Sequence, residues 1–194
     1  MLRLNHIVAL GAALLLGACA HPINISPKVD AQPGGTPVSR SVAYVISQED
    51  RDREVSKTTG SGDSVTYAPY RDLEGALFQV LNSIYRRVTL LRSAGDSALI
   101  ERNGATLVFV PKIVTEVMHD NAFIWPPTGF EVKIAYRVQE PGGRQVYQNT
   151  ATGTGNATFG ELQANKDFGL SGRRAAEAAL ATLRRQIESA PELK

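Results

Sequence analysis

Few side chains in this sequence combine into a group that could carry out a reaction. Its one cysteine is Cys19, and its three histidines are His6, His21 and His119. Nucleophilic catalysis needs a nucleophile, a base and an orienting group within hydrogen-bond reach. His119-Asp120 is the one candidate base pair, but neighbours on an extended chain point in opposite directions. We therefore expect a histidine at a hairpin end, and a protein that is not an enzyme.

Metal and phosphate sites also lack a matching pattern. A zinc site needs a set of His and Cys ligands, which this inventory does not supply. The run Glu49-Asp50-Arg51-Asp52 lacks the spacing of a calcium loop, and its arginines would neutralise the site. The stretch 58–63 (TTGSGD) has no lysine after its second glycine, and Asp63 would repel phosphate. We expect no metal, no soluble cofactor and a flexible surface loop at 58–63.

The residues before Cys19 have the pattern of an export signal. Arg3 supplies a positive charge, residues 7–16 are almost wholly apolar, and Gly17 and Ala18 are small. This order is typical of a secretory signal peptide. A membrane-spanning helix needs about 20 apolar residues, and this run is shorter. The sequence therefore predicts a signal peptide over residues 1–18.

The end of that signal, Leu16-Gly17-Ala18-Cys19, resembles the bacterial lipobox. The resemblance implies that Cys19 becomes the first mature residue and carries a covalent diacylglycerol and an N-acyl lipid such as palmitate. Several acyl chains together form a stable membrane anchor, whereas a single chain binds only marginally. Ala20 follows where an aspartate would mark retention in the inner membrane. The resemblance thus implies a lipoprotein on the periplasmic face of the outer membrane.

The charge balance gives no reason to expect nucleic acid as a partner. The whole chain has 21 basic and 19 acidic residues, and cleavage after residue 18 removes only Arg3 from this count. A surface so evenly balanced does not attract polyanions. Residues 19–40 contain four prolines and the pair Gly34-Gly35. This composition predicts a flexible tether, which would hold the domain roughly 25 Å from the membrane.

Residues 41–190 are expected to form a single periplasmic domain. Apolar residues recur at helical spacing over 72–86 and again after Ser171, an expected N-cap. Strand patterns cover 42–46, 106–118 and 130–139, and Pro111 indicates a bulge or an edge. Residues 141–144 (PGGR) predict a hairpin turn before a return strand. The fold class is therefore α+β, with a mostly antiparallel sheet of four to five strands and two amphipathic helices packed on one face.

The lipobox, the tether, this element order and the alanine-rich helix at 175–180 are similar to outer-membrane lipoproteins of the YajG type. They are also similar to the TolB N-terminal domain and to CsgG. The resemblance implies an accessory role in envelope assembly, transport or secretion. It carries over no site residue apart from Cys19.

Two segments are candidates for partner contacts. Phe123, Ile124 and Trp125 lie in a connection between two strands, where large apolar side chains mark an interface or fold back as a lid. The second segment, 47–71, shows no periodic pattern, and its Tyr67 and Tyr70 are expected to order against a partner or against the domain itself.

These observations predict a non-catalytic lipoprotein that acts as an accessory or assembly subunit of a cell-envelope complex. The membrane, through the lipid anchor, and one or more envelope proteins are the expected partners. The alternative is a periplasmic binding module for a cell-wall or lipid fragment. The sequence leaves the oligomeric state open.

Overall fold

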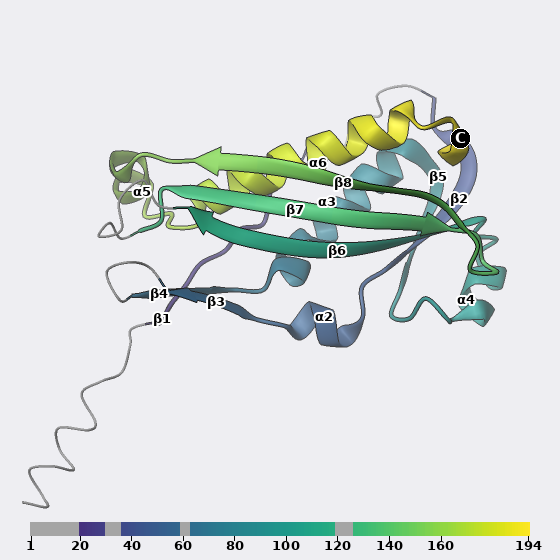
Figure 1. Ribbon diagram of the computed structural model, residues 1–194, viewed down its shortest axis with the longest axis horizontal. Coiled ribbons are helices and arrows are strands. Elements are labelled where there is room, and N and C mark those ends of the chain that lie inside the picture. Colours follow the sequence, from purple (N-terminus) through teal and green to yellow (C-terminus); the bar gives the residue numbers. More distant parts are fainter. Residues whose placement is uncertain (1–19, 30–35, 59–62, 119–125) are drawn as a thin grey trace, which may run out of the picture.

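The computed structural model describes residues 20–29, 36–58, 63–118 and 126–194. These residues form a five-stranded sheet, a three-stranded sheet and five α-helices (Figure 1). The longest strands pair in antiparallel fashion, and the two longest helices lie on one face of the larger sheet. The expected α+β fold is confirmed.

The larger sheet has the strand order β5-β2-β6-β7-β8. β2 pairs in parallel with β5 and β6, whereas β6-β7 and β7-β8 are antiparallel. The pairing of β2 with β6 ends at Phe109, so Pro111 lies where β6 is an edge and its missing N–H costs no ladder bond. The strand bounds are β2 (Val38–Val45), β5 (Tyr85–Leu91), β6 (Leu107–Met118), β7 (Gly129–Gln139) and β8 (Gln145–Asn156).

β7 and β8 form the predicted hairpin. The turn closes through hydrogen bonds from the Gly143 amide to the Glu140 carbonyl (2.8 Å) and from the Glu140 amide to the Arg144 carbonyl (2.9 Å). Gly143 has a φ of 87°, a conformation that L side chains rarely adopt. Alternate residues of β7 are buried, as the sequence predicts: Phe130, Val132, Ile134, Tyr136 and Val138.

The helices α3 (Pro69–Ile84) and α6 (Leu170–Ser189) cover that buried face (Figure 1). α3 begins with a proline, whose fixed φ suits the first helical position. α6 begins at Leu170 with Gly169 as its N-cap, so the expected cap at Ser171 is wrong. Ser171 is buried instead, and its hydroxyl donates to the Pro127 carbonyl (3.0 Å).

α6 lies unusually close to β8. A Cβ on Gly153 would overlap the backbone of Ala175 and Ala179, and one on Gly155 would overlap the backbone of Ser171 and Ala175. The alanine-rich sequence of α6 therefore serves close packing against glycines of the strand. On the other side of the sheet, the short α4 (Ser97–Arg102) covers only one end, where a small second core contains Ala43, Leu91, Ile100, Ala105 and Val108.

The expected loop at 47–71 is wrong for most of its length. It contains α2 (Gln48–Asp52), β3 (Val55–Thr58) and β4 (Ser64–Tyr67), and α3 already begins at residue 69. Each of the first three elements has five residues or fewer, which is too short to produce a visible periodicity. Part of the expected loop at 58–63 lies outside the described residues, and Thr58 itself belongs to β3.

The expected tether at 19–40 is also wrong where the structure describes it. β1 (Ala20–Pro22) pairs in parallel with β4 and completes the three-stranded sheet β1-β4-β3. Ile25 is fully buried in the main core. Burial of such a side chain contributes about 1.5–3 kcal/mol, enough to hold a proline-rich segment in place.

The folded unit is therefore wider than 41–190. Besides Ile25 on the N-terminal side, Leu193 is 1% exposed and belongs to the same core. Leu193 lies in a terminal 3-10 turn, Pro191–Leu193. The remaining element, α5 (Phe159–Asn165), connects β8 to α6 and begins with a capping box between Thr158 and Glu161.

Candidate functional site

The face of β6, β7 and β8 that points away from α3 and α6 is here called the open face. Its residues alternate along each strand with those that the helices bury. The strand register places them in cross-strand rows. From the α4 end, these rows are Val110–Arg137–Gln148, Lys112–Ala135–Thr150, Val114–Lys133–Thr152 and Glu116–Glu131–Thr154.

The open face combines positive charges with hydroxyl and amide groups. Val114 and Met118 are 41% and 37% exposed, so large apolar side chains also reach solvent on β6. Thr152 and Thr154 are exposed on β8. No helix in the described part of the chain covers this mixed surface, which therefore offers hydrogen-bonding and apolar contacts to a binding partner.

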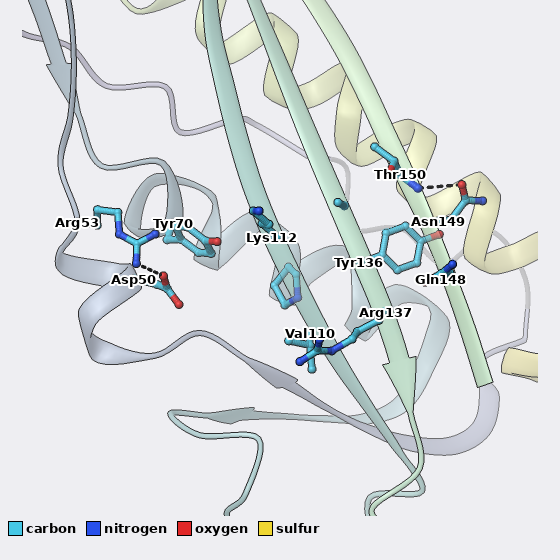
Figure 2. A pocket seen from close by; sticks show the side chains of 12 residues that line it. Asp50, Arg53, Tyr70, Val110, Lys112, Tyr136, Arg137, Gln148, Asn149 and Thr150 are labelled. Carbon is cyan, nitrogen blue, oxygen red and sulfur yellow. Dashed lines mark hydrogen bonds and ion pairs between the residues drawn. The ribbon is translucent and has the colours of Figure 1, made fainter. Parts of the chain in front are cut away.

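A cavity of about 760 Å³ opens at the α4 half of this face (Figure 2). Its floor comes from the first two rows of the open face, and Asp50, Arg53 and Tyr70 line its side at the free edge of β6. A volume of this size is within the range of small-molecule sites. Residues far apart in sequence therefore meet in one cavity because the register of three strands aligns them.

Two cations of this cavity differ from the others on the open face. Lys112 and Arg137 are exposed diagonal neighbours on β6 and β7, and neither forms an ion pair with any residue that the structure describes. Lys133, by contrast, is paired with Glu131 at 2.7 Å. Because an amide (Gln148) and a hydroxyl (Thr150) lie beside the two cations, the cavity presents the groups that hold an anionic, hydroxylated ligand.

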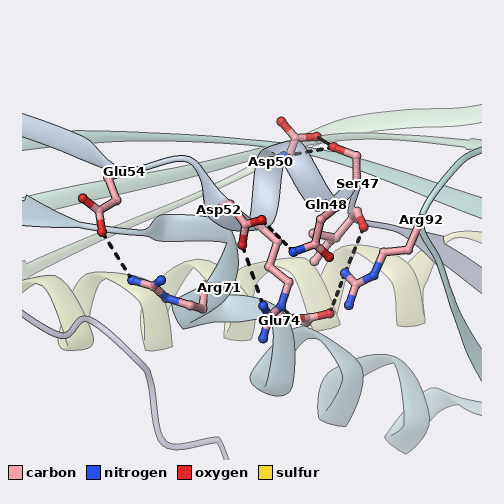
Figure 3. A network of polar contacts seen from close by, with 10 residues as sticks. Ser47, Gln48, Asp50, Asp52, Glu54, Arg71, Glu74 and Arg92 are labelled. Atoms are coloured by element: carbon pink, nitrogen blue, oxygen red, sulfur yellow. Dashed lines mark hydrogen bonds and ion pairs between the residues drawn. The ribbon is translucent and has the colours of Figure 1, made fainter.

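The side of the cavity is held by a polar network around α2 (Figure 3). The Ser47 hydroxyl caps this helix by accepting from the Asp50 amide (3.0 Å). Glu74 of α3, whose side chain is 15% exposed, accepts from Arg51 (2.9 Å) and from Arg92 (3.1 Å). The charge run at 49–54 is thus a set of contacts that fixes α2 against α3. It places Arg53, paired with Asp50 at 2.7 Å, at the edge of the cavity.

Tyr67 and Tyr70 are 3% and 5% exposed, so they pack against the domain itself, which is the second of the two expected roles. The Tyr70 hydroxyl lies at the free edge of β6, where it accepts a hydrogen bond from the Ile113 amide (3.1 Å). The Tyr67 hydroxyl lies 2.8 Å from the Thr115 hydroxyl. Burial raises the pKa of Tyr67 to about 12. Their role as partner-contact residues is therefore corrected.

The other predicted site residues lie outside the described part of the chain. These are Cys19, the lipid attachment site, and the apolar group Phe123, Ile124 and Trp125. The same holds for His119 and Asp120. Within 20–29, 36–58, 63–118 and 126–194, no three His, Cys, Asp or Glu side chains are grouped as metal ligands. In that same part of the chain, no helix has both the length and the apolar composition to cross a membrane.

Sequence reasoning missed the cavity residues Lys112, Arg137, Gln148 and Thr150. The alternation of 130–139 does place Arg137 on the polar face of its strand. It does not show which residue of β6 lies beside it, because that depends on the register of two strands. The pairing of Val110 with Arg137 is therefore information that the structure supplies.

No protein-family model and no curated protein sequence matches this chain. Among solved structures, a neuraminyllactose-binding hemagglutinin homolog from Helicobacter pylori is similar, with 10% identity and a TM-score of 0.50 over 89% of this chain and 94% of that one. At this identity the likeness shows a shared fold alone.

Two further solved structures match with lower TM-scores. A minor lipoprotein from Acinetobacter baumannii has 11% identity and a TM-score of 0.43 over 77% of this chain and 93% of that one. A PelC dodecamer from Paraburkholderia phytofirmans has 16% identity and a TM-score of 0.41 over 73% of this chain and 94% of that one. These scores are too low to carry an argument about this chain.

Proposed function

We propose that this protein is a non-catalytic bacterial lipoprotein, anchored through acylated Cys19 to the periplasmic face of the outer membrane. It acts there as an accessory or assembly subunit of a cell-envelope complex. The lipobox at 16–19 supports the anchor. The observation that carries the binding role is the open face, because three long strands present exposed side chains that no helix of the described chain covers.

The anchor is tested by metabolic labelling with palmitate, comparing the wild type with Cys19→Ser. We expect label and an outer-membrane location in the wild type, and loss of both in the variant. A mature wild-type protein that is unlabelled and found in the soluble periplasmic fraction would refute the anchored lipoprotein.

The binding role is tested by site-specific photocross-linking in intact cells. A photoreactive residue at Thr152 lies on the open face, and a matched control at Arg185 lies exposed on α6. We expect one defined envelope protein to cross-link from Thr152 and not from Arg185. Equal labelling from both positions, or none from Thr152, would contradict a partner on this face.

The second candidate function is a binding module for an anionic cell-wall or lipid fragment. Lys112 and Arg137, which form no ion pair with a described residue, favour this candidate together with Gln148 and Thr150 beside them. The similar structure from Helicobacter pylori is named for binding neuraminyllactose, which is an acidic saccharide. A ligand of this class would place its carboxylate or phosphate between the two cations and its hydroxyls along β8.

Calorimetric titration with a soluble muropeptide tests this candidate. We expect binding that weakens with salt, since charge pairs with an exposed ligand are screened. Lys112→Ala and Arg137→Ala should each weaken it about tenfold, in line with loss of one charge-assisted hydrogen bond, whereas Lys133→Ala should not. Unchanged affinity in both cavity variants would exclude the cavity as the binding site.

A further inference from the structure

The first described residues, 20–29, are held against the domain and are here called the N-terminal strap. β1 pairs with β4 in the register Ala20↔Ser64. On its other side, Ser64 of β4 pairs with Thr58 of β3. Beyond β1, the Ile23 amide donates to the Thr66 carbonyl (2.9 Å). The start of the strap is therefore a strand of a sheet, not a free chain.

The strap is fixed a second time where it crosses α3 and α6. Ile25 has no exposed surface, and its side chain occupies the space in which a Cβ on Gly172 would lie. The backbone of Asn24 similarly fills the space beside Gly169. Further along, the Lys28 amide donates to Glu177 of α6 (3.0 Å). The strap therefore packs directly against the two glycines at the start of α6.

This arrangement determines the distance between domain and lipid. Ala20 is bonded directly to Cys19, and consecutive Cα atoms lie about 3.8 Å apart. A flexible tether of about 20 residues would instead give a separation of roughly 25 Å. With the strap in place, a lipid on Cys19 leaves no length of free chain between itself and β1.

We infer that the acylated protein lies directly on the membrane surface, and that the three-stranded sheet faces the lipid headgroups with the end at which β1 and β4 begin and β3 ends. The last cross-strand row at that end is Ala20–Ser64–Thr58, in which Ala20 and Thr58 are exposed and Ser64 is buried between them. The inference rests on the proposed acylation of Cys19. α4 and the C-terminus lie at the opposite end of the molecule (Figure 1) and point away from the bilayer.

The same orientation decides how the open face is presented. Lys57 of β3 pairs with Glu116 near the end of β6 (3.3 Å). This end of the open face therefore lies beside the membrane-facing end of the three-stranded sheet. The turn at 140–144 lies at the other end of β7. The strands of the open face therefore extend from the membrane toward the periplasm, and the cavity lies at their distal half.

A depth measurement on the full acylated protein in lipid vesicles tests this orientation. Thr58→Cys and Ala98→Cys carry the same fluorophore, and headgroup nitroxide lipids serve as quenchers; both positions are exposed. Acylation of Cys19 leaves the introduced thiol as the one site for labelling. We expect quenching several-fold stronger at residue 58 than at residue 98.

A Gly/Ser linker of about 20 residues, beginning with Ala and placed after Cys19, is the matched control, because it restores a separation of roughly 25 Å. It should abolish the difference between the two positions. Palmitate incorporation is measured on the same samples. Acylated, membrane-bound protein with equal quenching at both positions overturns the orientation and leaves the anchor intact. Protein without acyl chains overturns the proposed function, and the orientation with it.

Discussion

On one face of β8, α6 lies so close that Gly153 has no space for a Cβ, while on the other face the next residues, Thr152 and Thr154, are exposed. The covered face is built from glycine, alanine and buried apolar side chains. The open face carries threonines, the cations Lys112, Lys133 and Arg137, and two exposed apolar residues, Val114 and Met118. β8 therefore packs closely against α6 on one face and exposes polar side chains on the other. We expect substitutions to destabilise the domain strongly on the covered face and only slightly on the open face.

The largest contrast is expected within β8 itself. Gly153→Val should destabilise the domain beyond the usual overpacking cost of about 1–3 kcal/mol, since the obstacle is the backbone of α6 and not a movable side chain. Thr152→Val, one residue away on the open face, should change the free energy of unfolding by less than about 0.5 kcal/mol. Urea denaturation of both variants measures the difference. Similar stability for the two would show that α6 does not lie against β8 as described.

The second contrast compares a buried with an exposed apolar residue. Ile25→Ala should cost about 3 kcal/mol, because it empties a fully buried position that Gly172 lines. Val114→Ala on the open face should cost less than about 0.5 kcal/mol. Thermal unfolding of the two variants gives the comparison. A cost for Ile25→Ala as small as that for Val114→Ala would mean that the strap is not part of the core.

A third, smaller effect is expected at the border between the faces, where β6 is an edge. Tyr70→Phe removes the hydroxyl that accepts from the buried Ile113 amide, and should cost about 1–2 kcal/mol. Tyr147→Phe removes a half-buried hydroxyl that accepts from exposed Asn149 and also lies beside Tyr136, and should cost less than Tyr70→Phe. Chemical denaturation measures both, and faster hydrogen exchange at the Ile113 amide in the first variant identifies the cause.

The smallest effect concerns an exposed contact outside both faces. Hydrogen bonds from Arg174 and from Thr158 lower the pKa of Glu161 to about 2. A carboxylate with a lowered folded-state pKa stabilises the fold above its unfolded pKa of about 4.3, and this contribution disappears as the pH falls toward the folded-state value. The difference in Tm between wild type and Glu161→Gln should therefore be constant above about pH 5 and decline at lower pH.

Thermal scans from pH 7 down to pH 2.5 follow this decline, and Arg174→Gln should reproduce it, because Arg174 supplies the main contact at 2.8 Å. A difference in Tm that does not depend on pH would show that the Glu161 charge is not involved.

The sequence predicted the elements that carry their own pattern. Six apolar residues at helical spacing predicted α3, and five alternating residues predicted β7 together with its buried face. The turn at Gly143 was predictable because its residues favour the required backbone conformation. Short elements were not, since α2, β3 and β4 have five residues or fewer and show no periodicity, and β4 also pairs with β1 from a distant part of the chain.

The candidate site was less accessible to sequence reasoning. Tyr67 and Tyr70 stood out by type, but burial against β6 gives them a structural role. Lys112 and Arg137 are 25 positions apart, and only the strand register makes them neighbours. The alanines of α6 were visible as a helix pattern, but not as the partners of Gly153 and Gly155.

By itself, the sequence determined the two amphipathic helices, the β7–β8 hairpin and the α+β class, because each shows a pattern among residues close together in the chain, while the resemblance to a lipobox at 16–19 stays a prediction. Tertiary structure decided that 20–29 is a strap and not a tether, and that one half of the open face forms a cavity where Lys112 and Arg137 have no ion-pair partner among the described residues. The physical reason is that Ile25 becomes a core residue only because Gly172 has no side chain and leaves space for it. The residues around Ile25 in this proline-rich segment do not show that this space exists on a helix about 150 residues away.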